Sequence, residues 1–405
     1  MRRFRAHWTT ATIIAAVLGS ITSASSQAEA VLYSFGGRDG KNPDARLLRD
    51  KSGTLYGTTA VGGTAHRGTV YALTQSKDGS WKENVLHSFA GENDGNGAWG
   101  GLIRDEKGVL YGITLAGGDQ ACRCGTAFAL SETAGTWSES IIHAFARTDG
   151  DTPVGELEQD SSGNLYGVTL SGGMNDASTI FELSRAGGSW NETVLYNFCS
   201  SGGFGCTDGK LPKGIRLDTS GAIFGTTQLG GDNGDGTIFE LSNSGGTWKL
   251  SVLYNYESFD APMGRLVEDS SGALYGTTYE GGPARCGDVF KFAQVNGVWK
   301  YSLLYAFSGR GDGCFPDAGL HLESTGALYG TTSTGGTTND GTVFKVSKQQ
   351  TGSWVETILH SFTGRPDGHY PLAAVIGGKS TDEVLYGVTD VGGENDKGAV
   401  FEIAP

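Results

Sequence analysis

Several aromatic, imidazole and guanidinium side chains fall outside every periodic pattern of the sequence. Groups of this kind can stack on a sugar ring, move a proton and neutralise an acid. Variation among loops would also scatter such residues without any shared function. The candidates for ligand binding are His66, Arg67, Trp99, His369 and Tyr370, with Arg123 and Arg285 as further unusual residues.

Aspartates that recur in "DG" pairs are the second group that could bind a ligand. They are Asp39, Asp94, Asp149, Asp208, Asp312 and Asp367, with Asp260 in "FDAP" as a variant. A ring of such carboxylates could bind Ca²⁺ or a polyhydroxylated ligand, and Asp39, Asp94 and Asp367 are included among the ligand-binding candidates. The alternative is that Asp-Gly simply makes turns.

A separate calcium candidate is the run "GGDNGDG" at residues 230–236, which offers Asp232, Asn233 and Asp235. It lacks the later Glu and other ligand positions of an EF-hand. Ca²⁺ is the one cofactor that the sequence suggests, and otherwise none is expected. Motifs of nucleophilic hydrolases, zinc proteases, phosphate-binding loops and dinucleotide-binding folds are all missing from the chain, so no motif points to a particular reaction.

The chain has six cysteines, an even number that suggests disulfides in a secreted protein. "CSSGGFGC" predicts a local bond between Cys199 and Cys206, and Cys286 with Cys314 is a plausible second pair. A bond between Cys122 and Cys124 would join residues only two apart, which is strained, so the sequence leaves the pairing of these two cysteines open. A zinc site would need paired C-x-x-C and His spacing, which the cysteines lack.

The elements that must position these residues are set by an internal repeat. "LYGTT" or a close relative occurs seven times, about 55 residues apart, with its aromatic residue at Tyr56, Tyr111, Tyr166, Phe224, Tyr275, Tyr329 and Tyr386. Around it lie four short runs rich in β-branched and aromatic residues, such as 101–105, 109–114, 125–130 and 137–145. Four strands in about fifty residues is the size of a β-propeller blade.

The two ends of the repeat predict how the ring closes. The last repeat ends at residues 399–403 without a fourth strand, while residues 31–35 form a fourth strand without the first three. We therefore predict an all-β, seven-bladed β-propeller of four-stranded antiparallel blades, closed by the N-terminal strand completing blade seven. The repeats lie near 45–89, 100–145, 155–198, 214–256, 264–307, 319–362 and 373–403.

The residues that recur in most of the repeats have structural explanations. Acidic residues six positions before the aromatic residue of the "LYGTT" motif are expected to cap tight turns between the first two strands. Six regularly spaced Trp, from Trp81 to Trp354, are expected to pack between blades. His87, His143 and His360 take the place that Tyr33, Tyr196, Tyr254 and Tyr305 hold in other blades, so we expect half-buried packing there rather than catalysis.

One face of the predicted disc carries the loops of variable length and all six cysteines, and such a face usually holds function. His66 belongs there to blade one, Trp99 enters blade two, and His369 and Tyr370 enter blade seven. Ring closure makes these blades neighbours, so the four side chains could form one sector.

Residues 1–30 have the features of a secretory signal peptide, with Arg2, Arg3 and Arg5, an apolar stretch, and cleavage expected after Ala28 or Ala30. The propeller then occupies residues 31–405, and we expect a secreted or periplasmic protein that does not insert in a membrane. The formal charge of −14 disfavours nucleic acid and anionic membranes as partners. The same charge is compatible with cations or neutral sugars, and solubility alone would also explain it.

The motifs "LYGTTxxGG", "GTVF", "GxW", "LHSF" and "DGxxP" together cover nearly the whole mature chain. In these motifs the sequence resembles the GloVer tandem-repeat family of secreted bacterial proteins. The resemblance implies no reaction and no catalytic residue. We therefore expect a monomeric, non-enzymatic module that binds or scaffolds an extracellular glycan or protein. The alternative is an extracellular polysaccharide lyase or glycoside hydrolase that uses the variable-loop face.

Overall fold

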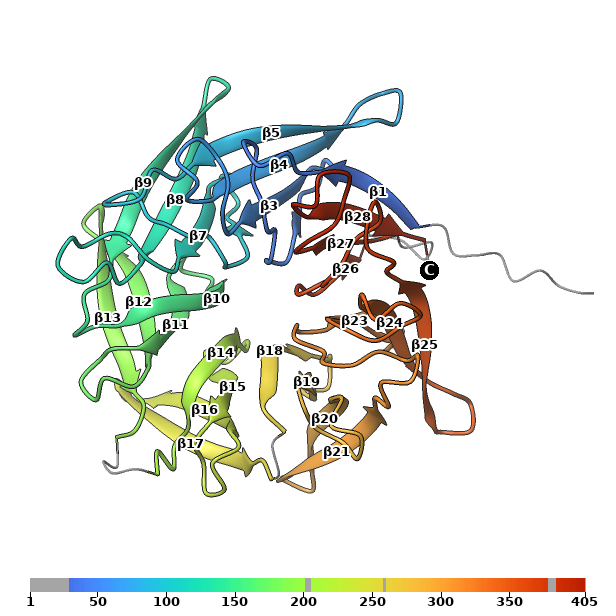
Figure 1. The fold of residues 1–405 in the computed structure, drawn as a ribbon. Helices are drawn as coiled ribbons and strands as arrows, with labels where there is room; N and C mark the ends of the chain where they lie inside the picture. The colour runs from blue at the N-terminus through green and yellow to red at the C-terminus, as the bar shows by residue number, and fades with distance from the viewer. Residues whose placement is uncertain (1–28, 201–204, 258–259, 378–383, 405) are drawn as a thin grey trace, which may run out of the picture.

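The chain forms seven four-stranded antiparallel sheets that are arranged as blades around a central axis (Figure 1). The computed structural model describes residues 29–200, 205–257, 260–377 and 384–404. Every regular element within these ranges is a strand, and no helix there is long and apolar enough to cross a membrane. The predicted seven-bladed β-propeller is confirmed.

Each blade contains strands A to D, ordered from the axis outward. The A strands are β2 (Leu48–Arg49), β6 (Ile103–Arg104), β10 (Asp151–Gln159), β14 (Lys210–Leu217), β18 (Pro262–Glu268), β22 (His321–Leu322) and β26 (Ile376–Gly377). The B strands are β3 (Leu55–Thr59), β7 (Leu110–Thr114), β11 (Leu165–Ser171), β15 (Ile223–Leu229), β19 (Leu274–Thr278), β23 (Leu328–Thr332) and β27 (Leu385–Thr389).

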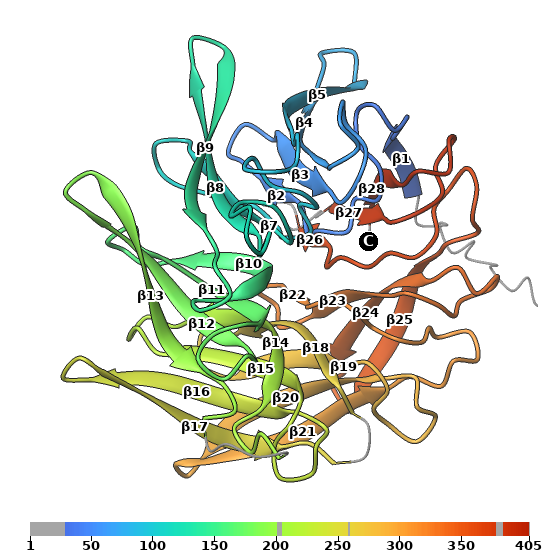
Figure 2. The same ribbon diagram turned by 60° about the vertical axis from the view of Figure 1, so that its left-hand side comes forward.

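The two outer strands of each blade are longer than most A strands. The C strands are β4 (Thr69–Gln75), β8 (Thr126–Thr133), β12 (Thr179–Ala186), β16 (Thr237–Ser244), β20 (Asp288–Val295), β24 (Thr342–Lys348) and β28 (Ala399–Ile403). The D strands are β5 (Trp81–Ser88), β9 (Thr136–Ala144), β13 (Ser189–Asn197), β17 (Thr247–Asn255), β21 (Val298–Ala306), β25 (Trp354–Ser361) and β1 (Glu29–Ser34). The hairpins β8–β9, β12–β13 and β16–β17 extend beyond the rest of the disc (Figure 2).

The innermost strand is shorter than predicted in four blades, where it keeps only two residues. In blade one an isolated bridge between Lys41 and Val61 precedes a gap, and β2 follows the gap. Pro43, Pro316 and Pro371 fall in such gaps, and proline has no N–H to donate to the ladder.

The ring is closed by the N-terminal strand, as the sequence predicts. Strand β1 pairs antiparallel with β28, with Val31 opposite Phe401 and Tyr33 opposite Val400. The first and last strands lie side by side in Figure 1, where the blue β1 runs along the red β28. The strand begins two residues before the predicted position 31, because Glu29 already pairs with Ile403. Residues 1–28 of the predicted signal peptide lie outside the described residues.

A glycine in each B strand makes room for an aromatic ring on the paired C strand. In blade three Gly167 stands opposite Phe181, and a Cβ added at Gly167 would lie 2.4 Å from the ring. The other six pairs are Gly57–Tyr71, Gly112–Phe128, Gly225–Phe239, Gly276–Phe290, Gly330–Phe344 and Gly387–Phe401. The glycine of the "LYG" motif is therefore required by close approach of the ring.

The same seven aromatic rings join neighbouring blades. Each meets, edge to face, the ring that ends strand D of the preceding blade, and all seven rings on strand C are fully buried. The pairs are Phe35–Tyr71, Phe89–Phe128, Phe145–Phe181, Phe198–Phe239, Tyr256–Phe290, Phe307–Phe344 and Phe362–Phe401. Edge-to-face geometry is a favoured arrangement for aromatic pairs, so each junction has one such contact at its centre.

The other recurring residues have the structural roles expected of them. Trp137 of blade two packs edge-on against Tyr56 of blade one, at 6.4 Å between ring centroids. The turn residue Asp50 accepts hydrogen bonds from the backbone N–H groups of Ser52 and Thr54, and from the hydroxyl of Tyr56.

Adding a methyl group at the central glycine of a B strand should destabilise the propeller. We expect Gly167→Ala to lower the free energy of unfolding by about 1–3 kcal/mol, because the new Cβ overlaps the Phe181 ring. Denaturant unfolding measures the change. Gly205→Ala is the matched control, since its Cβ would meet nothing closer than 3.9 Å. An equal stability for both variants would contradict the role given to the ring.

Candidate functional site

The innermost strands and the residues that precede them surround a cavity of about 140 Å³. Its lining draws residues from all seven blades, which places it around the axis of the ring. The side chains in this lining that could bind a ligand are Asp44, Arg46, Trp99, Glu156, Lys213, Arg265 and Asp317. We call this the axial cavity.

Three of these charged residues share one position of the repeat. Arg46, Glu156 and Arg265 each directly precede the buried aliphatic residue of strand A, such as Leu157. The other four blades place Gly or Ala there, at Gly101, Gly214, Gly319 and Ala374. These residues were not among the predicted site residues, although an alignment of the seven repeats would have shown charges in a column of small residues.

Most charges around the axis are compensated by ion pairs between different blades. Arg46 Nη1 lies 3.5 Å from Glu156 Oε2, which links blades one and three. Glu158 pairs with Arg265 and lies 3.6 Å from Arg216. Burial raises the pKa of Glu158, and the charges of the two arginines oppose that rise. These pairs hold the A strands of separate blades at fixed distances around the cavity.

Asp44 is an acidic residue of the axial cavity whose pKa is strongly raised. Burial, a hydrogen bond with Asp390, and the charges of Asp390 and Asp317 raise the pKa of Asp44 to about 9. Its Oδ1 atom is buried without a hydrogen-bond partner. Asp44 is therefore protonated at neutral pH and can donate a hydrogen bond. Burial also raises the pKa of Asp317 and lowers that of Lys213, while the attraction between the two charges opposes both shifts.

Trp99 supplies the apolar surface of the cavity. Its side chain is 53% exposed although it lies next to the polar groups described above. An exposed indole beside hydrogen-bonding groups can stack on a ligand ring while those groups contact its polar edge. Trp99 was among the predicted ligand-binding residues, and the structure places it in the axial cavity.

The other predicted ligand-binding residues with aromatic, imidazole or guanidinium groups lie outside the lining of the axial cavity. His369 and Tyr370 contact each other, with ring centroids 3.6 Å apart, and His369 Nδ1 lies 2.6 Å from Asp340 Oδ1. His66 and Arg67 are exposed in the loop between β3 and β4. None of these four residues lines the axial cavity. The carbonyl of Arg67 nevertheless accepts a hydrogen bond from the backbone N–H of Gly97, two residues before Trp99.

The recurring aspartates hold the turns between blades. Asp39 accepts hydrogen bonds from the backbone of Gly36 and from the Tyr33 hydroxyl. Asp94 likewise bonds to the backbone of Ala90 and to His87, and Asp367 to Thr363 and His360. Asp39, Asp94 and Asp367 are not part of the lining of the axial cavity.

Two of the calcium candidates in residues 230–236 make hydrogen bonds to the last residue of β17 and to the residue after it. Asp232 accepts a hydrogen bond from the side-chain amide of Asn255, at 3.1 Å. The side chain of Asn233 donates to the carbonyl of Tyr256 at 3.0 Å. These bonds pin the loop between β15 and β16 against β17.

The two predicted disulfides, Cys199–Cys206 and Cys286–Cys314, are present. Cys122 and Cys124, whose pairing the sequence leaves open, also bond to each other. The Cys286–Cys314 bond joins the loop after β19 to the connection after β21. Disulfides are typical of extracellular or periplasmic proteins.

Five glutamates on the D strands form a second polar feature. Glu29, Glu83, Glu139, Glu192 and Glu356 each have an Oε1 atom that is buried without a hydrogen-bond partner. Burial, and then the charge of the aspartate in the neighbouring turn, raises the pKa of each to about 7. These carboxyl groups are therefore partly protonated near neutral pH.

The fold is a tandem-repeat propeller with a small axial cavity, whose lining includes Trp99 and several charged side chains. The chain belongs to the Gloeobacter/Verrucomicrobia repeat family, whose sequence profile matches residues 9–215 and 211–405. The resemblance to this family that the repeat motifs indicate is confirmed. No curated protein matches the chain in sequence.

Two solved structures are similar to the chain at low sequence identity. The extracellular domain of a proposed one-component system from B. thetaiotaomicron is 12% identical, with a TM-score of 0.56. The match covers 93% of this chain but only 40% of that one, so the chain spans about two fifths of its length. A gluconolactonase from Xanthomonas campestris is 14% identical over 70% of this chain and 83% of its own, with a TM-score of 0.40. The first likeness concerns the fold alone.

The stability of the protein should fall as the pH rises from about 4.5 to about 7. Burial raises the pKa of the Glu356 carboxyl from its ordinary value of 4.5 to about 7, so the folded state holds the proton more tightly in this window. We expect Glu356→Gln to make the pH dependence of the melting temperature shallower. Glu106→Gln, in an exposed turn, is the control and should leave the slope unchanged. A wild-type slope in the Glu356 variant would contradict the burial effect.

Proposed function

We propose that this chain is a secreted, non-enzymatic binding module whose axial cavity holds the end of an extracellular glycan. The observation that carries the proposal is the half-exposed Trp99 ring beside the hydrogen-bonding groups of Asp44, Lys213 and Asp317. An aromatic face combined with a few polar groups is the usual composition of a site for a sugar ring.

The size of the cavity supports a ligand that enters by one end. At about 140 Å³ it is smaller than pockets that enclose a drug-sized molecule, which measure about 300–1,000 Å³. A terminal sugar unit can occupy such a space while the rest of the chain stays outside. The ion pairs between Arg46 and Glu156, and between Arg265 and Glu158, leave little uncompensated charge, which favours a neutral ligand.

Asp44 favours a second candidate, an extracellular carbohydrate-active enzyme. A carboxyl group with a pKa of about 9 is protonated at neutral pH, as a general acid must be. An assay for turnover of the bound glycan distinguishes the two candidate functions. The binding module should give no product from the glycan it holds, whereas an enzyme should release product and lose that activity in Asp44→Asn.

The pairing of the closing strand predicts where the signal peptide of a secreted module is cleaved. Cleavage after Ala30 would remove Glu29 and Ala30, which pair with Ile403 and Glu402 in the closing strand. We therefore expect cleavage after Ala28, so that the mature chain begins at Glu29. Intact-mass measurement of the exported protein tests this, and a mature chain that begins at Val31 would contradict it.

Replacing Trp99 should weaken glycan binding. We expect Trp99→Ala to bind about tenfold more weakly or worse, because truncating a central aromatic group costs about 1.4 kcal/mol or more. A glycan array identifies the ligand and calorimetry measures its affinity.

The matched control is Tyr370→Ala, which removes a ring that is 37% exposed and lies outside the axial cavity. This variant should bind as tightly as the wild type. Loss of binding in Tyr370→Ala, with Trp99→Ala unaffected, would show that the ligand binds near Tyr370 and not in the axial cavity. Binding to a protein and to no glycan would overturn the assignment of the ligand.

A further inference from the structure

Among the described residues, three blade junctions bring one imidazole and two carboxylates together. In each, a His near the end of strand D meets the Asp of the following turn and a Glu on strand D of the next blade. One ligand atom from each residue lies within 4.8 Å of the other two. The three groups are His87, Asp94 and Glu139; His143, Asp149 and Glu192; and His360, Asp367 and Glu29. We call them the His junctions.

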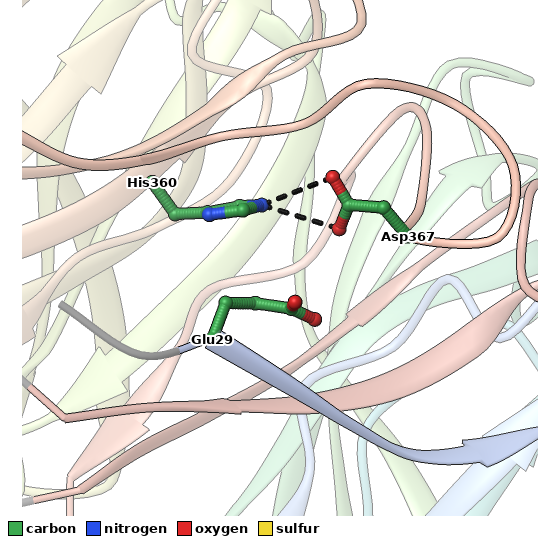
Figure 3. A group of neighbouring side chains, drawn as sticks. All are labelled: Glu29, His360 and Asp367. Carbon is green, nitrogen blue, oxygen red and sulfur yellow. Dashed lines mark hydrogen bonds and ion pairs between the residues drawn. The ribbon is translucent and has the colours of Figure 1, made fainter. Parts of the chain in front are cut away.

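Figure 3 shows the junction that closes the ring. His360 Nε2 lies 3.1 Å from each carboxylate oxygen of Asp367. Glu29, at the start of β1, extends its carboxylate alongside this pair and makes no marked interaction with it. In the other two junctions the imidazole Nε2 lies 3.0 Å from Asp94 Oδ1 and 3.2 Å from Asp149 Oδ2.

Several polar atoms in the His junctions are buried without a hydrogen-bond partner. They include Oε1 of Glu29, Glu139 and Glu192, and Nε2 of His143, which lies near Asp149 without forming a hydrogen bond. Buried polar atoms nearly always have a partner, so each of these unsatisfied atoms calls for one. A single group placed between the three side chains would satisfy all of them.

The remaining junctions show that the imidazole is not needed to hold the turn. Tyr33, Tyr196 and Tyr305 donate their hydroxyls to Asp39, Asp208 and Asp312 at 2.5–2.8 Å. Tyrosine therefore serves the structural role. A His occupies the strand-D position only in junctions where the next blade supplies a Glu. In the two junctions where Leu250 or Tyr301 replaces that Glu, the strand-D residue is Tyr. Within this chain, the nitrogen is present only where two carboxylates accompany it.

We propose that the three His junctions bind divalent transition-metal ions, with Zn²⁺ as the reference ion. Each would use the imidazole Nε2, one Asp oxygen and Glu Oε1, and leave a fourth position for water. One nitrogen and two carboxylates suit Zn²⁺, whereas Ca²⁺ requires six to eight oxygens. Zinc bonds of about 2.0–2.1 Å place tetrahedral ligands about 3.3 Å apart, close to the 3.0–3.2 Å between imidazole and carboxylate here.

Such ions would connect the D strands of neighbouring blades at the outer part of the disc. The ion at His360 would also tie the N-terminal strand to blade six, because Glu29 belongs to β1. Binding to the folded chain raises its stability by mass action. This role is independent of ligand binding in the axial cavity.

The number of bound ions tests the proposal. Untagged protein that retains Glu29 is stripped with a chelator and titrated with ZnCl₂ by calorimetry, with the bound metal measured by elemental analysis. We expect three ions per chain and a higher melting temperature with Zn²⁺. Ca²⁺ in the same assay should not bind. A stripped wild-type chain that binds no Zn²⁺ would overturn the proposal.

Substitutions between His and Tyr provide controls that preserve the turn. His143→Tyr should lower the number of ions by one, because Tyr keeps a donor for the Asp and removes the nitrogen. Tyr305→His should raise it by one, since Asp312 and Glu356 are already in place. Tyr196→His should add none, because Leu250 replaces the Glu there. An unchanged number in the first two variants, or a gain in the third, would contradict the ligand set.

Discussion

The propeller depends on one contact that is made seven times, an aromatic ring lying over a strand glycine. The ring of Phe181 covers Gly167 within its own blade and receives the edge of Phe145 from the blade before. One side chain therefore fixes both the packing inside a sheet and the angle between two sheets. The loops and the axial residues can vary because this contact, repeated around the ring, does not involve them.

The fold could be predicted from the sequence because every element that builds it recurs. Seven copies of one pattern give the blade number, and incomplete first and last copies give the closure between β1 and β28. The lengths of the inner strands could not be predicted in the same way. They depend on where the chain leaves the ladder around residues such as Pro43, which the motif does not encode.

The site was harder to predict because its residues are exceptions within the repeat and come from distant blades. Trp99 was recognisable as an unusual aromatic residue, but its neighbours in the cavity were not. Arg46 and Glu156 are 110 positions apart and meet only because the ring brings their blades across the axis. Their signal is a charge in a column of glycine and alanine, which becomes visible once the repeats are aligned. His143 was interpreted as packing because Tyr takes its place in other blades, and its carboxylate partners Asp149 and Glu192 are not adjacent to it in the sequence.

The pairing of β1 with β28 also orders events during synthesis. Strand β1 pairs with β28, the last strand of the propeller in chain order, so blade seven cannot assemble until β28 has been made. Blades one to six each consist of contiguous sequence and can form as they emerge. Any arc of blades that forms before β28 is made has an unpaired sheet edge, which is open to pairing with another chain until the ring closes.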